Sequence, residues 1–204
     1  MFDARLRPLI DPVLGTIARR LARAGIGADG LTIAGATLGL AGAALVPFGL
    51  PLSALALFLA GRILDGLDGA VAGQTRRTDR GAFLDVALDF LVYAAYPLAF
   101  AVADPARNAL AAACLLAAFL ADGAAFLAFA ALAAKRGLET RAQGLKSLYY
   151  LSGLAEGAET IAVFALACLV PEWFPVLAYA FAAICAVSAA ARILIGCTAL
   201  ADQP

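Results

Sequence analysis

Long apolar segments follow one another along almost the whole of this 204-residue chain. A helix needs roughly 20 residues to cross a hydrocarbon core about 30 Å thick. Charged residues make up only 15% of the chain, whereas about a quarter is usual in soluble domains. We therefore predict an all-α, polytopic membrane protein with six transmembrane helices, near residues 31–49, 52–73, 81–103, 107–134, 151–170 and 174–200.

Basic residues gather in every second connection between these segments. Twelve of the fifteen Lys and Arg residues lie before the first span, between spans two and three, or between spans four and five. The opposite connections contain only Arg107. An excess of basic residues marks the short cytoplasmic loops of membrane proteins. Both termini are therefore predicted to face the cytoplasm, in a membrane of the bacterial inner-membrane type.

The first 28 residues differ from the spans that follow. Apolar residues recur there at helical spacing, while arginines occupy the other side of the helix. A basic amphipathic helix of this kind usually lies in the membrane interface. The segment has no uninterrupted apolar core, so no cleavable signal peptide is predicted. We predict an amphipathic juxtamembrane helix at 1–28 and a six-helix transmembrane domain at 29–204.

Histidine is absent from the chain. This absence excludes a Ser-His-Asp triad, an HExxH zinc site and phosphoryl transfer through a histidine. The four cysteines lie inside apolar runs without CxxC spacing, which is typical of small buried apolar residues. Any chemistry must therefore come from other side chains.

Four aspartates interrupt the apolar pattern of spans two and three. Asp65 and Asp68 are three residues apart, and Asp85 and Asp89 are four apart, so each pair shares one helix face. The two spans run antiparallel across a short loop. All four carboxylates are therefore predicted to lie at a similar depth near the cytoplasmic helix ends.

Four carboxylates this close together cannot all stay ionised unless cations join them. Arg62 is one turn away, and few other basic residues are near. Hard divalent cations with oxygen ligands fit best, above all Mg²⁺ or Mn²⁺. Paired ions of this kind suit a displacement at phosphorus. Gly69 and Ala72 share the face of Asp65, which leaves room for a large ligand.

The pattern Asp-x₂-Asp-Gly-x₂-Ala-x₈-Gly-x₃-Asp-x₃-Asp, from Asp65 to Asp89, resembles the signature of the CDP-alcohol phosphotransferases. These are six-helix membrane enzymes that transfer a phosphatidyl or similar group to a hydroxyl acceptor. The amphipathic N-terminal helix and the Gly30-Leu31-Thr32 start of span one also agree with this family. The resemblance covers essentially the whole chain and identifies residues 29–204 as a catalytic domain.

The resemblance implies a role for each residue of the motif. Two Mg²⁺ or Mn²⁺ ions would be bound by Asp65, Asp68, Asp85 and Asp89. Asp89 would also be the base that deprotonates the acceptor. The nucleotide pocket would be formed by Thr32, Asp65, Gly69, Ala72 and Gly81. The acceptor oxygen would attack the lipid-bearing phosphorus of CDP-diacylglycerol or a similar CDP-linked lipid, and CMP would leave. Relatives form homodimers, so a homodimer is implied as well.

The acceptor is less constrained by the sequence. Candidate acceptor-binding residues are Lys135, Arg136, Arg141, Lys146, Tyr149, Glu156 and Glu159. The basic ones favour a phosphorylated polyol, such as glycerol 3-phosphate or an inositol phosphate, although a plain cytoplasmic loop explains them too. The glutamates favour the alternative, an unphosphorylated alcohol or amino-alcohol. Asp122 and Arg192 also lie within spans. Either they line a polar site, or they belong to a polar network between helices.

One departure from the family pattern opens two further alternatives. Gly73 stands where the family usually has an arginine. Either Arg62, Arg76 or Arg77 substitutes for it, or the chain is slow, altered in donor preference or catalytically inactive. An ion-coupled transporter is the rival from another class. It would distribute its acidic residues across the bilayer, whereas here four cluster at one end and no two halves repeat.

Overall fold

The computed structural model describes residues 3–136 and 157–201, and within these ranges the protein is all-α. The helices are α1 (Asp3–Arg23), α2 (Ala28–Leu45), α3 (Pro51–Gln74), α4 (Asp79–Ala103), α5 (Pro105–Lys135), α6 (Gly157–Leu169) and α7 (Phe174–Ala199). Short 3₁₀ turns, η1 (Val46–Phe48) and η2 (Pro171–Trp173), precede α3 and α7. The predicted all-α, polytopic class is confirmed.

Four helical segments of the described chain are long and apolar enough to cross a membrane. They are Ala28–Phe48, Asp79–Ala103, Pro105–Lys135 and Pro171–Ala199. Helix α3 has the length but carries Arg62, Asp65 and Asp68, which lower its apolar character. Helix α6 has only 13 described residues. Large apolar side chains such as Leu110 and Leu120 are more than two-thirds exposed, as lipid-facing residues of a membrane protein are.

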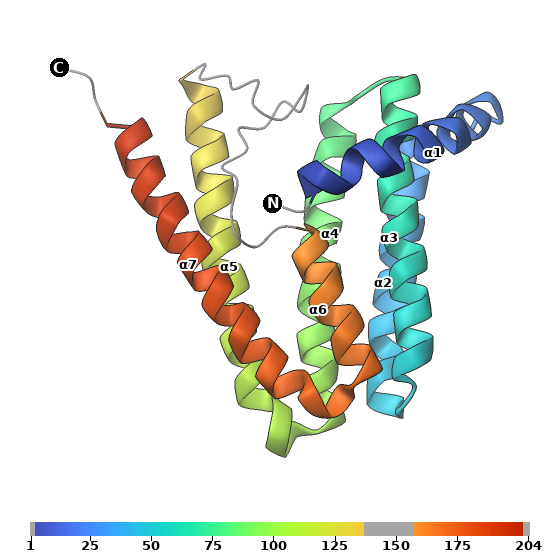
Figure 1. Cartoon of the computed structure of the whole chain (residues 1–204). Helices are drawn as coiled ribbons and strands as arrows, with labels where there is room; N and C mark the ends of the chain where they lie inside the picture. The colour runs from blue at the N-terminus through green and yellow to red at the C-terminus, as the bar shows by residue number, and fades with distance from the viewer. Residues whose placement is uncertain (1–2, 137–156, 202–204) are drawn as a thin grey trace.

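The helices run up and down between two ends of the molecule (Figure 1). The connections α2–α3, α4–α5 and α6–α7 lie at one end, and α1 and the α3–α4 connection lie at the other. Thr78 caps α4 by accepting a hydrogen bond of 3.0 Å from the Gly81 N–H, and Asp104 caps α5 in the same way. These caps satisfy backbone N–H groups that the first helical turn leaves without partners.

Small residues bring α2 and α3 into close contact. A Cβ atom added to Gly61 would lie 2.6 Å from the carbonyl oxygen of Gly35, and one added to Gly42 would lie 2.8 Å from that of Ala54. Glycine at such crossings lets two membrane helices approach backbone to backbone. This close crossing places the start of α2, which contains Thr32, beside the last third of α3, which contains Asp68.

An aromatic cluster joins α3, α4 and α6. The Tyr96 and Phe164 rings are stacked with centroids 5.3 Å apart, and the Phe58 ring lies 4.8 Å from that of Tyr96. The Tyr96 hydroxyl donates a hydrogen bond of 3.1 Å to the carbonyl of Ala54. All three side chains are fully buried, so this cluster packs α3 and α4, the two helices that contain the aspartates, against each other and against α6.

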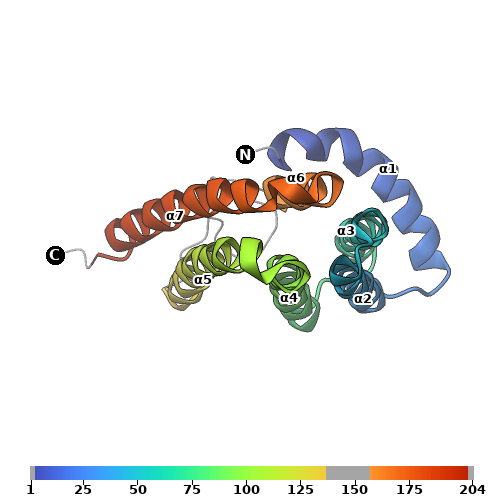
Figure 2. The ribbon, with the colours of Figure 1, turned by 90° about the horizontal axis from the view of Figure 1, so that it is seen from below.

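Helix α1 lies along the outer side of the α2–α3 pair, as Figure 2 shows. Its buried Ala18 packs in one cluster with Leu31 of α2 and with Leu67 and Val71 of α3. The apolar face of α1 thus covers the turn of α3 that contains Asp68. On the other side of the molecule, α5 and α7 pack against each other, and α5 also packs against α4 (Figure 2).

Candidate metal centre

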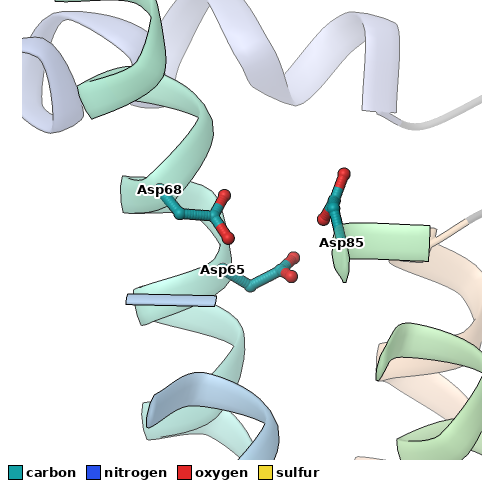
Figure 3. Close-up of side chains that lie close together, drawn as sticks. All are labelled: Asp65, Asp68 and Asp85. Carbon is teal, nitrogen blue, oxygen red and sulfur yellow. The ribbon is translucent and has the colours of Figure 1, made fainter. Parts of the chain in front are cut away.

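Asp65 and Asp68 on α3 and Asp85 on α4 direct their carboxylates toward one another (Figure 3). One oxygen of each lies within 4.8 Å of the others. The three-residue spacing on α3 puts Asp65 and Asp68 on one face, and the short connection at residues 75–78 returns the chain antiparallel so that Asp85 reaches the same depth. Three of the four predicted carboxylates are therefore brought together.

Thr32 holds Asp68 in place. Its hydroxyl donates to Asp68 Oδ2 at 2.5 Å, and both side chains are buried. A carboxylate that accepts a buried hydrogen bond has one oxygen fixed, which leaves the other to face Asp65 and Asp85. The sequence placed Thr32 near the nucleotide, and the structure puts it directly behind a carboxylate of the cluster.

Asp89 does not join the other three aspartates. It lies one turn further along α4, where its Oδ1 accepts a hydrogen bond of 2.6 Å from Arg62 Nη1. The same Nη1 is 3.5 Å from Asp65 Oδ2, and the Arg62 guanidinium stacks over the Tyr93 ring at 5.4 Å. The sequence identified Arg62 as a neighbour of the cluster. It did not indicate that Arg62 would link Asp89 to Asp65.

Asp65 and Asp89 share one buried cation, Arg62, while Asp65, Asp68 and Asp85 come close together from two helices. Ligands of one Mg²⁺ or Mn²⁺ ion lie roughly 3–4 Å apart, so small side-chain rotations would bring the three clustered carboxylates into coordination. The oxygen donor set fits a hard divalent cation.

The small residues of the motif leave space beside this cluster. No atom lies within 4 Å of a Cβ added to Gly69, which is exposed, and Ala72 is half-buried one turn further on. A Cβ added to Gly81 would lie 3.1 Å from Asp29 Oδ1, so a larger residue would press on the start of α2. Asp29 itself pairs with the exposed Arg80 at 3.4 Å.

Arg77 reaches the position of the missing family arginine. Its Nη2 lies 3.9 Å from the place that a Cβ atom of residue 73 would occupy. The guanidinium thus approaches the side of α3 from which the family arginine would extend. Of the three arginines considered as substitutes, Arg77 is beside Gly73 and Arg62 is engaged with Asp89.

Only part of the predicted acceptor set lies within the described residues. Arg141, Lys146, Tyr149 and Glu156 lie outside them. Lys135 and Arg136 are exposed at the end of α5, and Arg136 Nη1 donates a hydrogen bond of 2.7 Å to the carbonyl of Leu200. Glu159 lies half-buried in the first turn of α6.

Asp122 and Arg192 form a buried ion pair between α5 and α7. Arg192 Nη1 lies 3.0 Å from Asp122 Oδ2, and the guanidinium stacks over the Phe126 ring at 5.4 Å. The sequence singled out both residues but did not pair them. The available signal was one acid and one base in the interior of two spans whose other charged residues lie only near the ends of α5, because unpaired charges are costly in a bilayer.

Solved structures share this fold. Mycobacterium tuberculosis phosphatidylinositol phosphate synthase (PgsA1) in complex with manganese and citrate matches with a TM-score of 0.73 at 22% identity, over 94% of this chain and 93% of that chain. The same enzyme with CDP-DAG bound matches with a TM-score of 0.72 at 22% identity, over 95% and 99%. This chain therefore shares its fold with phosphatidylinositol phosphate synthase.

A curated relative agrees in sequence. Inner membrane protein YnjF of Escherichia coli (strain K12) is 46% identical over 196 residues, which are 96% of this chain and 95% of that protein. No family model matches the chain. With the aspartate pattern and the fold, this relationship shows that the chain belongs to the CDP-alcohol phosphotransferase family, as the sequence predicted. Its predicted location as an integral membrane protein of the inner-membrane type is confirmed as well.

Proposed function

We propose that this protein transfers a phosphatidyl or similar group from a CDP-linked lipid, such as CDP-diacylglycerol, to a hydroxyl acceptor and releases CMP. The observation that carries the proposal is the convergence of Asp65, Asp68 and Asp85, from two helices, within 4.8 Å. The PgsA1 structures support it, because that enzyme shares the fold and was solved with manganese and with CDP-DAG.

Each residue of the site has a proposed role in the transfer reaction. Asp65, Asp68 and Asp85 would hold a divalent cation, Mg²⁺ or Mn²⁺, which neutralises charge on the diphosphate and on the departing CMP. A second ion would bind where Asp89 adds a fourth carboxylate. Asp89 would accept the proton of the acceptor hydroxyl. The hydroxyl oxygen of the acceptor would then form a bond to the lipid-bearing phosphorus, while the bond from that phosphorus to CMP breaks. Thr32, Asp65, Gly69, Ala72 and Gly81 would line the nucleotide pocket.

The arrangement of charges supports a cytoplasmic site in a six-span bundle. The four aspartates lie in the last turns of α3 and the first turns of α4, near the α3–α4 connection. Helix α1 lies at the same end of the molecule (Figure 1), and α1 and this connection are rich in arginine. In this proposal α2 to α7 each cross the membrane and both termini face the cytoplasm. Residues 1–28 then form an interfacial element against the catalytic domain at 29–204.

The acceptor that we propose is a phosphorylated polyol, and basic residues at the cytoplasmic end support it. Lys135 and Arg136 end α5 at that end of the molecule, and Arg141 and Lys146 follow in the chain. Such side chains bind phosphate through charge-assisted hydrogen bonds. Glu159 at the start of α6 favours the second candidate, an unphosphorylated alcohol or amino-alcohol, because a carboxylate binds hydroxyls but repels phosphate.

Purified protein tests this function directly. With CDP-diacylglycerol, Mn²⁺ and a panel of phosphorylated and unphosphorylated alcohols, we expect CMP release that EDTA abolishes. Asp65→Asn should lower the rate by at least about a hundredfold, because it removes a metal ligand. Asp79→Asn, at the exposed start of α4, is the matched control and should keep the wild-type rate.

Two results would contradict the proposal. Undiminished CMP release from metal-stripped protein would remove the aspartate cluster from the chemistry. No CMP release with any acceptor would favour an inactive family member, and cation flux through proteoliposomes containing the protein would favour the transporter. The product lipid, identified by mass spectrometry, decides between the two classes of acceptor.

A further inference from the structure

Arg62 is a buried cation located between two carboxylates of the candidate metal centre. Its side chain is only 6% exposed, and a single nitrogen, Nη1, lies 2.6 Å from Asp89 Oδ1 and 3.5 Å from Asp65 Oδ2. Among the described residues its Nε is buried without a hydrogen-bond partner. The guanidinium is therefore drawn to this place by the two carboxylates, while part of its own hydrogen-bonding capacity stays unused.

The position of Arg62 bears on the second ion. A second divalent cation bound through Asp89 and held close to the first ion would have to contact Asp65 and Asp89 from the space between them. Arg62 Nη1 already lies in contact with both. A guanidinium and a divalent cation cannot both occupy that space, since they would repel each other at contact distance in a partly desolvated site.

A purely structural role for Arg62 does not explain why its partners are Asp65 and Asp89. A buried arginine could link α3 to α4 through any carboxylate, as Arg192 links α7 to α5 through Asp122. Arg62 instead contacts two aspartates of the family motif, one of which, Asp65, also belongs to the three-carboxylate cluster. Its charge is thus coupled to the metal ligands themselves.

We propose that Arg62 is a built-in competitor for the second divalent cation. The cluster of Asp65, Asp68 and Asp85 binds one ion tightly, and a second ion binds through Asp89 only when Arg62 leaves that carboxylate. The first ion therefore binds more tightly than the second ion in this protein. This inference rests on the proposed function, because it takes the aspartate cluster to be a divalent-metal site.

The same contact positions Asp89. While Arg62 donates to Oδ1, Asp89 has one oxygen fewer for the acceptor hydroxyl and stays outside the three-carboxylate cluster. Arg62 is thus a positioning residue that acts through Asp89. Its effect should appear in metal binding even when no substrate is present.

The test is a titration of the purified full-length chain with Mn²⁺ alone, followed by the EPR signal of free Mn²⁺ and by calorimetry. We expect the wild type to bind one ion tightly and a second at least about tenfold more weakly. In Arg62→Gln the affinity for the second ion should rise by about tenfold or more, which corresponds to about 1.4 kcal/mol. Arg62→Lys keeps the positive charge and should remain closer to the wild type.

The exposed pair of Arg80 and Asp29 provides the matched control, because Arg80→Gln removes an arginine that faces an aspartate away from Asp89. It should change neither affinity. Two equal sites in the wild type, or identical titrations of wild type, Arg62→Gln and Arg62→Lys, would overturn the inference while leaving the proposed function intact. If Arg62→Gln does not fold, Arg62→Met, which also removes the positive charge, takes its place, and an unchanged second affinity in that variant overturns the inference equally. A wild type that binds no Mn²⁺ overturns the proposed function, and this inference with it.

Discussion

Thr32 shows how one side chain can fix the geometry of a candidate metal ligand. It projects from α2, while its acceptor Asp68 belongs to α3, and both are buried. Residues that hydrogen-bond to a metal ligand orient it, and their loss typically lowers metal affinity 10–100-fold. At this scale, the geometry of the site depends on the hydrogen bonds that orient the carboxylates as well as on the carboxylates themselves.

Thr32→Val should therefore weaken Mn²⁺ binding by about 10–100-fold without unfolding the protein, because it removes the hydroxyl and keeps the shape. The measurement is a Mn²⁺ titration of the purified variant. Thr37→Val is the matched control on the same helix, since the Thr37 hydroxyl bonds only to the carbonyl of Ile33 among the described residues. Equal loss in both variants would contradict an orienting role for Thr32.

Pairs of helices are held by two different devices in this protein. The α2–α3 pair depends on glycines that bring backbones together, whereas the α5–α7 pair contains the buried ion pair of Asp122 and Arg192. Close packing without polar groups costs little in a bilayer, but buried charges are stable only as a pair. The glycine contacts and the buried ion pair each lead to a testable prediction.

Gly61→Ala should destabilise the α2–α3 crossing, because its Cβ would lie 2.6 Å from the carbonyl oxygen of Gly35 and backbone must move. Overpacking of this kind costs about 1–3 kcal/mol. Thermal unfolding in mild detergent measures it. Gly30→Ala, where no atom lies within 4 Å of the added Cβ, serves as the control and should leave the unfolding temperature almost unchanged.

Asp122→Asn and Arg192→Met should each lower the free energy of unfolding by more than half of the loss that the double variant shows. Either single change leaves a buried charge without its partner, whereas the double change removes both charges. We expect a coupling energy of about 0.5–3 kcal/mol in a double-mutant cycle followed by unfolding in detergent. Strictly additive effects would show that the pair contributes no net coupling.

The whole molecule presents apolar faces to its surroundings and gathers its unbalanced charge at one end. Four helical segments of the described chain have the length and composition of membrane spans, and the aspartates lie on α3 and α4 near the arginine-rich connection between these helices. On α5, small residues alternate with large exposed ones, and Ala113, Ala117 and Ala121 are all exposed on its outer side. Such a stripe permits close contact with a second helix.

At this scale we predict a homodimer in which α5 takes part. Ala117→Phe should shift the protein toward monomer, because a large ring would hold two α5 helices apart. Native mass spectrometry in mild detergent measures the two species. Ala186→Phe, at an exposed position on α7, is the control and should leave the dimer intact. Wild-type protein that is monomeric under the same conditions would contradict the prediction.

The sequence by itself determined the all-α membrane class and the family. Apolar length and basic-loop asymmetry are local properties of the chain, and the Asp65 to Asp89 motif brings three carboxylates together through helix spacing and one short connection. The tertiary structure decided what depends on contacts between distant segments. Thr32 meets Asp68 because α2 crosses α3 at glycines, Arg192 meets Asp122 across 70 residues, and Asp89 turns to Arg62 because a buried cation attracts the nearest carboxylate. Spacing along a helix predicts which residues share a face, but charge pairing in a low-dielectric interior is settled only when the faces meet.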